Sequence, residues 1–72
     1  MKNLILTSDD KGEVWYNLDA IVNIAFGLAQ NLLTKSDIHG NDLKPLETVM
    51  VIYFKDKNSA TYSVSGWTMS FD

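Results

Sequence analysis

The side chains whose types are best suited to catalysis lie in one polar segment. Ser36, His39 and Asp42 are the three types that form a nucleophilic triad, with serine attacking, histidine as base and aspartate orienting it. All three lie within seven residues of one loop, with no sign of a pocket or an oxyanion hole. The nine acidic residues are scattered over turns and loops, and no spacing brings two carboxylates together for acid–base work. We therefore expect a protein that is not an enzyme.

The same segment partly matches a calcium-binding loop. Asp37, His39 and Asn41 occupy the first three ligand positions, but the sixth position should be glycine and is Asp42. The twelfth should be glutamate and is Thr48. Cysteine is absent and His39 is the only histidine, so a zinc site would lack its usual ligands. We expect no metal and no cofactor, and an ordinary exposed histidine in this loop.

Length and charge narrow the class of protein further. Seventy-two residues make a single small domain, 1–72, whose lone core is marginal and which has no disulfide to support it, so oligomerisation is the remedy left open. A net charge of −3 and a pI near 4.8 argue against nucleic acid as a partner. All six basic residues are lysine, a coding style of AT-rich genomes that would suit a phage or mobile element.

We expect no signal peptide at the N-terminus. The apolar run that ends at Leu6 is cut off by Asp9 and Asp10 before a hydrophobic region could form. No run approaches the ~18 apolar residues of a membrane span. We expect a cytoplasmic protein without a membrane partner.

The segment from Glu47 to Ser65 predicts a β-hairpin. Val49, Val51 and Tyr53 share one face of the first strand, and the residues between them are also apolar, which is typical of a central strand covered on both sides. A polar turn follows, and the return strand alternates apolar with polar residues. Val51 should lie near the centre of the sheet.

A second hairpin is predicted near the N-terminus. Leu4 to Thr7 and Glu13 to Tyr16 read as strands, and Gly12 can take the left-handed conformation that closes their turn. Asp9 and Asp10 are expected to be solvated turn residues.

The segment from Asp19 to Leu33 allows two interpretations. Apolar residues recur there at helical spacing after a capping residue, which favours a helix. Alternatively, Ile21 to Phe26 is a strand, Gly27 breaks it, and only Leu28 to Leu33 is helical. With the helix, the fold class is α+β: a mainly antiparallel sheet of four to five strands in two hairpins, with one helix between them.

The tail combines apolar alternation with a lack of charge. From Asn58 to Phe71 there is no charged side chain, and Trp67, Met69 and Phe71 alternate with Thr68 and Ser70. This predicts a strand with one wholly apolar face, which natural sheets normally protect. These three side chains either complete the core or pack across a subunit or partner boundary.

One stretch resembles a known family. Asn17-Leu18-Asp19-Ala20-Ile21-Val22-Asn23-Ile24 follows a strand and precedes a Thr-Val strand with a hairpin, and in this it is similar to the small bacterial FlbD-like proteins associated with flagella and swarming. The resemblance covers about Leu4 to Ile24 and Thr48 to Val64. It implies a mainly antiparallel β core and transfers no catalytic residue. Residues 25–47 and the non-acidic tail depart from the family pattern.

Two functions are consistent with these features. The first is a non-enzymatic interaction protein, a small oligomer that binds a protein partner or itself and acts as regulator or inhibitor, with Trp67, Met69, Phe71 and Trp15 as interface residues. The alternative is a small-ligand-binding oligomer with an aromatic pocket between subunits. Its planar ligand would stack on five candidate aromatics, namely Trp15, Tyr16, Tyr53, Tyr62 and Trp67.

Overall fold

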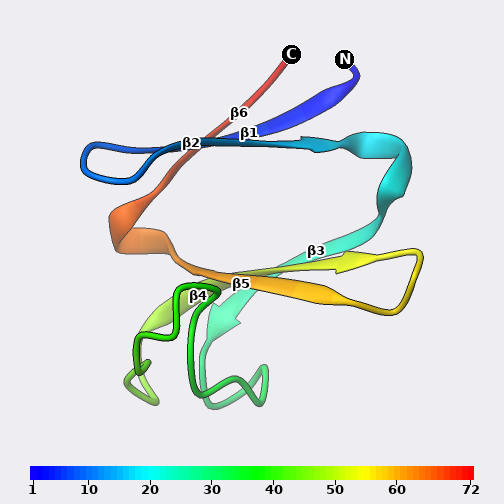
Figure 1. Ribbon diagram of the computed structural model, residues 1–72. Coiled ribbons are helices and arrows are strands. Elements are labelled where there is room, and N and C mark those ends of the chain that lie inside the picture. The colour runs from blue at the N-terminus through cyan, green and yellow to red at the C-terminus, as the bar shows by residue number, and fades with distance from the viewer.

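The computed structural model describes residues 1–72 as six strands and two short 3-10 helices. Three strands form each of two antiparallel sheets, with the orders β2-β1-β6 and β3-β4-β5. Figure 1 shows the first sheet as the upper layer and the second as the lower layer. No α-helix lies between the hairpins, so the expected α+β fold is wrong, and the protein is nearly all β. It also has six strands where four to five were predicted, and they form two sheets rather than one.

The N-terminal hairpin is confirmed. β1 (Asn3–Ser8) pairs with β2 (Gly12–Asn17), and Gly12 has a left-handed φ of +79°, which glycine adopts without steric cost. The Ser8 hydroxyl donates to Oδ1 of Asp10 at 2.8 Å, so this acid does serve the turn.

The predicted helix between Asp19 and Leu33 is replaced mainly by strand β3 (Ile21–Leu28). β3 pairs with β4 along its length, with a bulge between Ile21 and Asn23. β-branched residues at the start of the segment fit a pleated surface, and Gly27 is a poor helix former but is tolerated here because the ladder continues through it. The alternative interpretation was nearer the truth, although the strand runs past Gly27 and residues 29–33 form turns rather than a helix.

The central hairpin is confirmed as well. β4 (Thr48–Phe54) lies between β3 and β5 (Ser59–Ser63), which makes it the central strand of its sheet. Lys57 takes the left-handed turn position with a φ of +73°, while Asp56 accepts hydrogen bonds from the backbone and the side chain of Asn58. The two apolar faces of β4 are both covered, as its sequence predicted.

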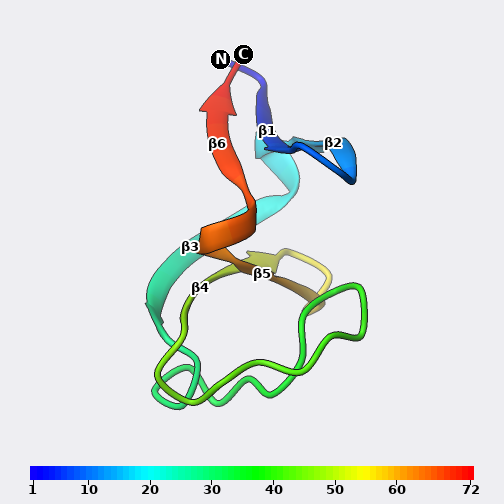
Figure 2. The ribbon, with the colours of Figure 1, turned by 90° about the vertical axis from the view of Figure 1, so that its left-hand side faces the viewer.

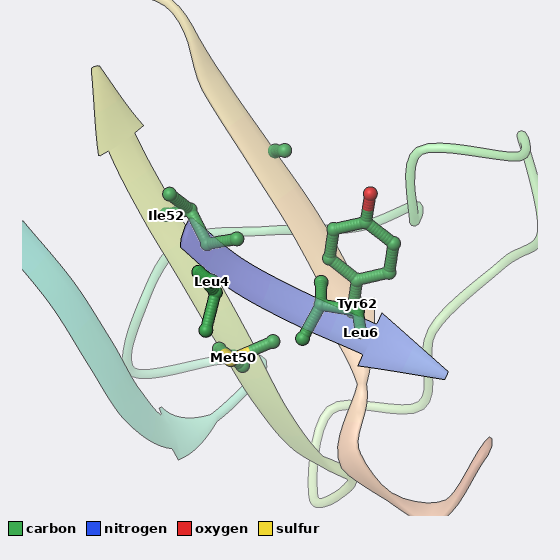
Figure 3. Packing of buried hydrophobic residues seen from close by; sticks show 6 residues of the cluster. Leu4, Leu6, Met50, Ile52 and Tyr62 are labelled. Carbon is green, nitrogen blue, oxygen red and sulfur yellow. The ribbon is translucent and has the colours of Figure 1, made fainter. Parts of the chain in front are cut away.

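The main core lies between the two sheets. β1 crosses over β4 and β5 with Leu4 and Leu6 directed at them (Figure 3). Six buried side chains make up this core, Leu4, Leu6, Met50, Ile52, Ala60 and Tyr62. Because these side chains belong to strands from both sheets, removing either sheet would expose the core of the other.

A second, smaller core covers the other face of the β3-β4-β5 sheet. Val49, Val51 and Ala29 are buried there, with Leu32 and Leu43 packed against them. The covering residues come from the long connection between β3 and β4, residues 29–47. This connection therefore covers the face of the sheet that is turned away from the main core.

The sheets are joined by the two 3-10 helices, η1 (Leu18–Ala20) and η2 (Val64–Gly66). After η2 the chain forms β6 (Thr68–Phe71), which pairs with β1. The backbone of Asp72 also exchanges hydrogen bonds with Asn3, so the two termini lie side by side (Figure 1). No helix is long and apolar enough to cross a membrane.

Candidate protein-binding surface

Strand β6 places two large apolar side chains at the edge of the core without burying them. Met69 pairs with Leu6, and Phe71 pairs with Leu4. Directly paired residues of an antiparallel ladder project from the same face, so Met69 and Phe71 point toward the interior of the sandwich. Nevertheless they remain 38% and 46% exposed, because β6 is the last strand of its sheet.

Strand β3 contributes a third such side chain from the opposite sheet. Phe26 pairs with the buried Met50, so it also projects from the inner face, yet it is 56% exposed. β3 and β6 lie on the same side of the sandwich, away from β2 and β5 (Figure 2). We call this side, with Phe26, Met69 and Phe71, the open side.

The side formed by β2 and β5 is closed by aromatic contacts. The hydroxyl groups of Tyr16 and Tyr62 share a hydrogen bond that connects the two sheets, and their rings meet edge to face with 6.3 Å between the ring centroids. The ring of Tyr16 also lies 5.3 Å from that of Phe54. Burial, reinforced by the bond from Tyr16, raises the pKa of the Tyr62 phenol. Unlike the apolar side chains of the open side, these aromatic residues contact and hydrogen-bond one another.

Trp67, predicted as an interface residue, instead packs against the main core. It follows η2, is half-buried, and meets the ring of Tyr62 edge to face at 5.0 Å. The ring of His39 stacks on that of Trp67, with 5.8 Å between the ring centroids and 7° between the ring planes. The loop that carries His39 is attached to β5, because Ile38 donates its N–H to the carbonyl oxygen of Thr61 at 2.9 Å. The loop and Trp67 therefore finish the core on this side.

Trp15, the fourth predicted interface residue, lies on another surface. It pairs with Ile5, whose neighbours Leu4 and Leu6 point inward, so Trp15 projects from the outer face of its sheet. It is 51% exposed, and its Nε1 donates to Oε1 of Glu13 at 2.9 Å. The four predicted residues thus divide into an open-side pair, one core residue and one isolated surface tryptophan.

The five aromatics proposed to stack a ligand do not converge within one chain. Tyr62 is buried, Tyr16 and Trp67 contact it, and Trp15 lies on the outer face of the first sheet. Tyr53 pairs with Ser59 on the outer face of the other sheet. They point to several surfaces rather than into one cleft.

The open side is also free of charge along its sequence. No aspartate, glutamate or lysine occurs from Ala20 to Thr34, which includes β3, or from Asn58 to Phe71, which includes β6. No three histidine or acidic side chains gather elsewhere to hold a metal ion.

The carboxylates with shifted pKa values support turns and loops. A hydrogen bond from Ser8 lowers the pKa of Asp10. Burial would raise the pKa of Asp37, but hydrogen bonds from Asn41 and from the backbone of His39 outweigh it and lower the pKa.

Phe26 was missed by the sequence reasoning. The helical interpretation left it outside the apolar stripe, whereas a period of two places it on the face of Ile24. Reading the segment as a strand would have found it.

Comparison of the chain with family models, with curated proteins and with solved structures found no match.

Proposed function

We propose that this is a non-enzymatic interaction protein, which binds a protein partner through the open side and acts on it as a regulator or inhibitor. The observation that supports this most strongly is the placement of Phe26, Met69 and Phe71. They project from inner faces, as core residues do, but they lie on edge strands and remain 38–56% exposed. Aromatic and methionine side chains are enriched at the centres of protein interfaces.

The absence of charge on β3 and β6 adds to this. A binding surface that carries charge must desolvate it or pair it, whereas an uncharged apolar surface gains free energy on burial alone. The aromatic residues can then serve as anchors that fill pockets in the partner.

Affinity purification with the full chain as bait tests the proposal. A variant with Met69→Ser and Phe71→Ser should lose the proteins that the wild-type chain retains. Trp15→Ser is the matched control, since it removes a more exposed aromatic from the outer face, and should retain them. A protein retained by wild type and the double variant but lost with Trp15→Ser would move the binding site to the outer face. Circular dichroism of each variant establishes that it is folded.

A further inference from the structure

The two sheets have four free edges, and they are protected to very different degrees. The edge of β5 is covered by the loop in which Ile38 donates to Thr61. The edge of β2 carries Glu13 and is flanked by charged residues at both ends. β6 is only four residues long and is followed by Asp72. Short strands, charges and covering loops are the usual means by which proteins stop edges from pairing with other chains.

Beyond the bulge near its start, β3 has none of these protections. It is the longest strand, with eight residues, and contains no charged residue and no proline. Its bulge lies between Ile21 and Asn23, which leaves Asn23 to Leu28 as a regular strand. Val22 in the bulge and Phe26 beyond it are both more than half exposed.

The backbone groups on this edge can be assigned from the register. Ala29 donates its N–H to the carbonyl oxygen of Glu47 at 2.9 Å, just beyond the β3–β4 ladder. Alternate residues of an antiparallel strand direct both polar groups to the same side, so Ala25 and Gly27 face β4 as Ala29 does. Ile24 and Phe26 must then direct N–H and C=O to the free edge. No other segment of the chain bonds to these groups.

We infer that the partner at the open side is a second copy of this chain, paired antiparallel with it along β3. This inference rests on the proposed function. The pairing would satisfy the outward groups of Ile24 and Phe26 in both copies and would join three strands from each copy into one continuous sheet. The inner faces of both copies then lie on the same side of that sheet, and Phe26, Met69 and Phe71 come to lie at or beside the junction.

The charge pattern favours a second copy over a partner that is recognised by opposite charge. At a two-fold interface a side chain on the axis meets its own counterpart, and those beside it meet symmetry-related neighbours, so like charges near the axis would repel one another. Each chain carries a net charge of −3, yet the edge along β3 has none. In any one antiparallel register only one position can lie on the axis, and every residue from Asn23 to Leu28 that could do so is uncharged. A partner recognised by opposite charge would find nothing on this edge to bind.

Analytical ultracentrifugation of the full chain tests the inference. We expect a dimer with twice the 8.1 kDa mass of one chain. Phe26→Lys places two like charges at the junction and should raise the dissociation constant by about tenfold or more. Thr48→Lys is the matched control, because it adds the same charge to an exposed position at the start of β4, and it should leave the dimer intact.

A second pair of variants separates the contribution of the backbone to dimer stability from that of the side chain. Phe26→Ala and Phe26→Pro both remove the ring, but only proline also removes the outward N–H. The proline variant should dissociate at least about tenfold more readily than the alanine variant if the edge pairs by hydrogen bonds. Circular dichroism identifies a variant that fails to fold. If the proline variant does not fold, the dissociation constant of Phe26→Lys decides the test by itself.

Two results would overturn the inference. One is a wild-type chain that is monomeric at every concentration, and the other is a dimer that neither Phe26→Lys nor Phe26→Pro weakens. A monomer that still retains another protein through Met69 and Phe71 would refute the self-pairing while leaving the proposed function intact. If the chain dimerises along β3 and retains no other protein in affinity purification, self-association is the whole of the proposed binding function.

Discussion

The hydrogen bond between Tyr16 and Tyr62 is the most specific connection between the two sheets, and removing it gives a quantitative test of the fold. Tyr62→Phe deletes the hydroxyl but keeps the ring that contacts Trp67 at 5.0 Å. Tyr16→Phe deletes the other partner and keeps the contact with Phe54. Neither substitution opens a cavity, so the hydrogen bond itself should account for the change in the free energy of unfolding.

The expected magnitude follows from the usual net value of such a bond. Each single substitution should lower the free energy of unfolding by about 1 kcal/mol. For a domain of this size, that corresponds to a fall in melting temperature of roughly 4–8 °C. Urea unfolding of the two single variants and the double variant gives a double-mutant cycle, in which the double variant should lose little more than either single one.

The same pair makes a prediction about pH. The pKa of Tyr62 is raised in the folded protein above its ordinary value of 10.0, so the unfolded chain loses this proton first. The stability that Tyr62 contributes is therefore complete below pH 10 and is lost as the pH rises further. Tyr62→Phe should abolish this alkaline loss. Additive single effects together with an unchanged alkaline profile would refute the view that this bond joins the sheets.

Three further predictions concern single positions. Val51→Asp should unfold the domain as seen by circular dichroism, since Val51 is buried under the long connection and an unpaired charge there has no partner, whereas Thr48→Asp on an exposed position of the same strand should not. Leu33→Gly should raise the free energy of unfolding by about 1 kcal/mol in thermal melts, because Leu33 is 91% exposed and has a left-handed φ of +55°, and Leu33→Ala should show no such gain. The hydrogen bond from Ser63, with one from the backbone of Lys44, lowers the pKa of Glu47, so its contribution to stability is present above the ordinary value of 4.5 and is lost as the pH falls through its lower folded pKa. Glu47→Gln should flatten the acid limb of the pH profile, and an unchanged limb would count against this role.

Both hairpins were predictable because their signals are local. Alternation over a few residues decides which face of a strand is apolar, and Gly12 decides where the first turn closes. The two apolar faces of β4 correctly indicated a strand covered on both sides. In this part of the chain, local preference and the final packing agree.

The segment containing β3 was mispredicted because its partner is distant in sequence. Ile21, Ile24, Ala25 and Leu28 fit a helical stripe, and nothing nearby argues strongly for a strand. The deciding contribution is the ladder with β4, which begins twenty residues later in the chain. Tertiary pairing of this kind commonly overrides weak local propensity.

The candidate surface was half predictable for the same reason. The alternation of Met69 and Phe71 identified the apolar face of β6 from the sequence alone. Trp67 fitted the same alternation, but η2 ends just before it, and the ring turns to the core instead. Phe26 joins the other two only through the arrangement of two sheets, which no local pattern reveals.

Photo-crosslinking in the cells that produce the protein tests the central claim most directly, namely that the open side binds a protein. A photoreactive phenylalanine analogue is placed at Phe71 in one variant and at Trp15 in another, and the adducts are identified by mass spectrometry. The account predicts a discrete protein adduct, to a second copy or to another chain, from position 71 and none from position 15. Adducts from position 15 alone would contradict it, and so would the absence of any protein adduct from position 71.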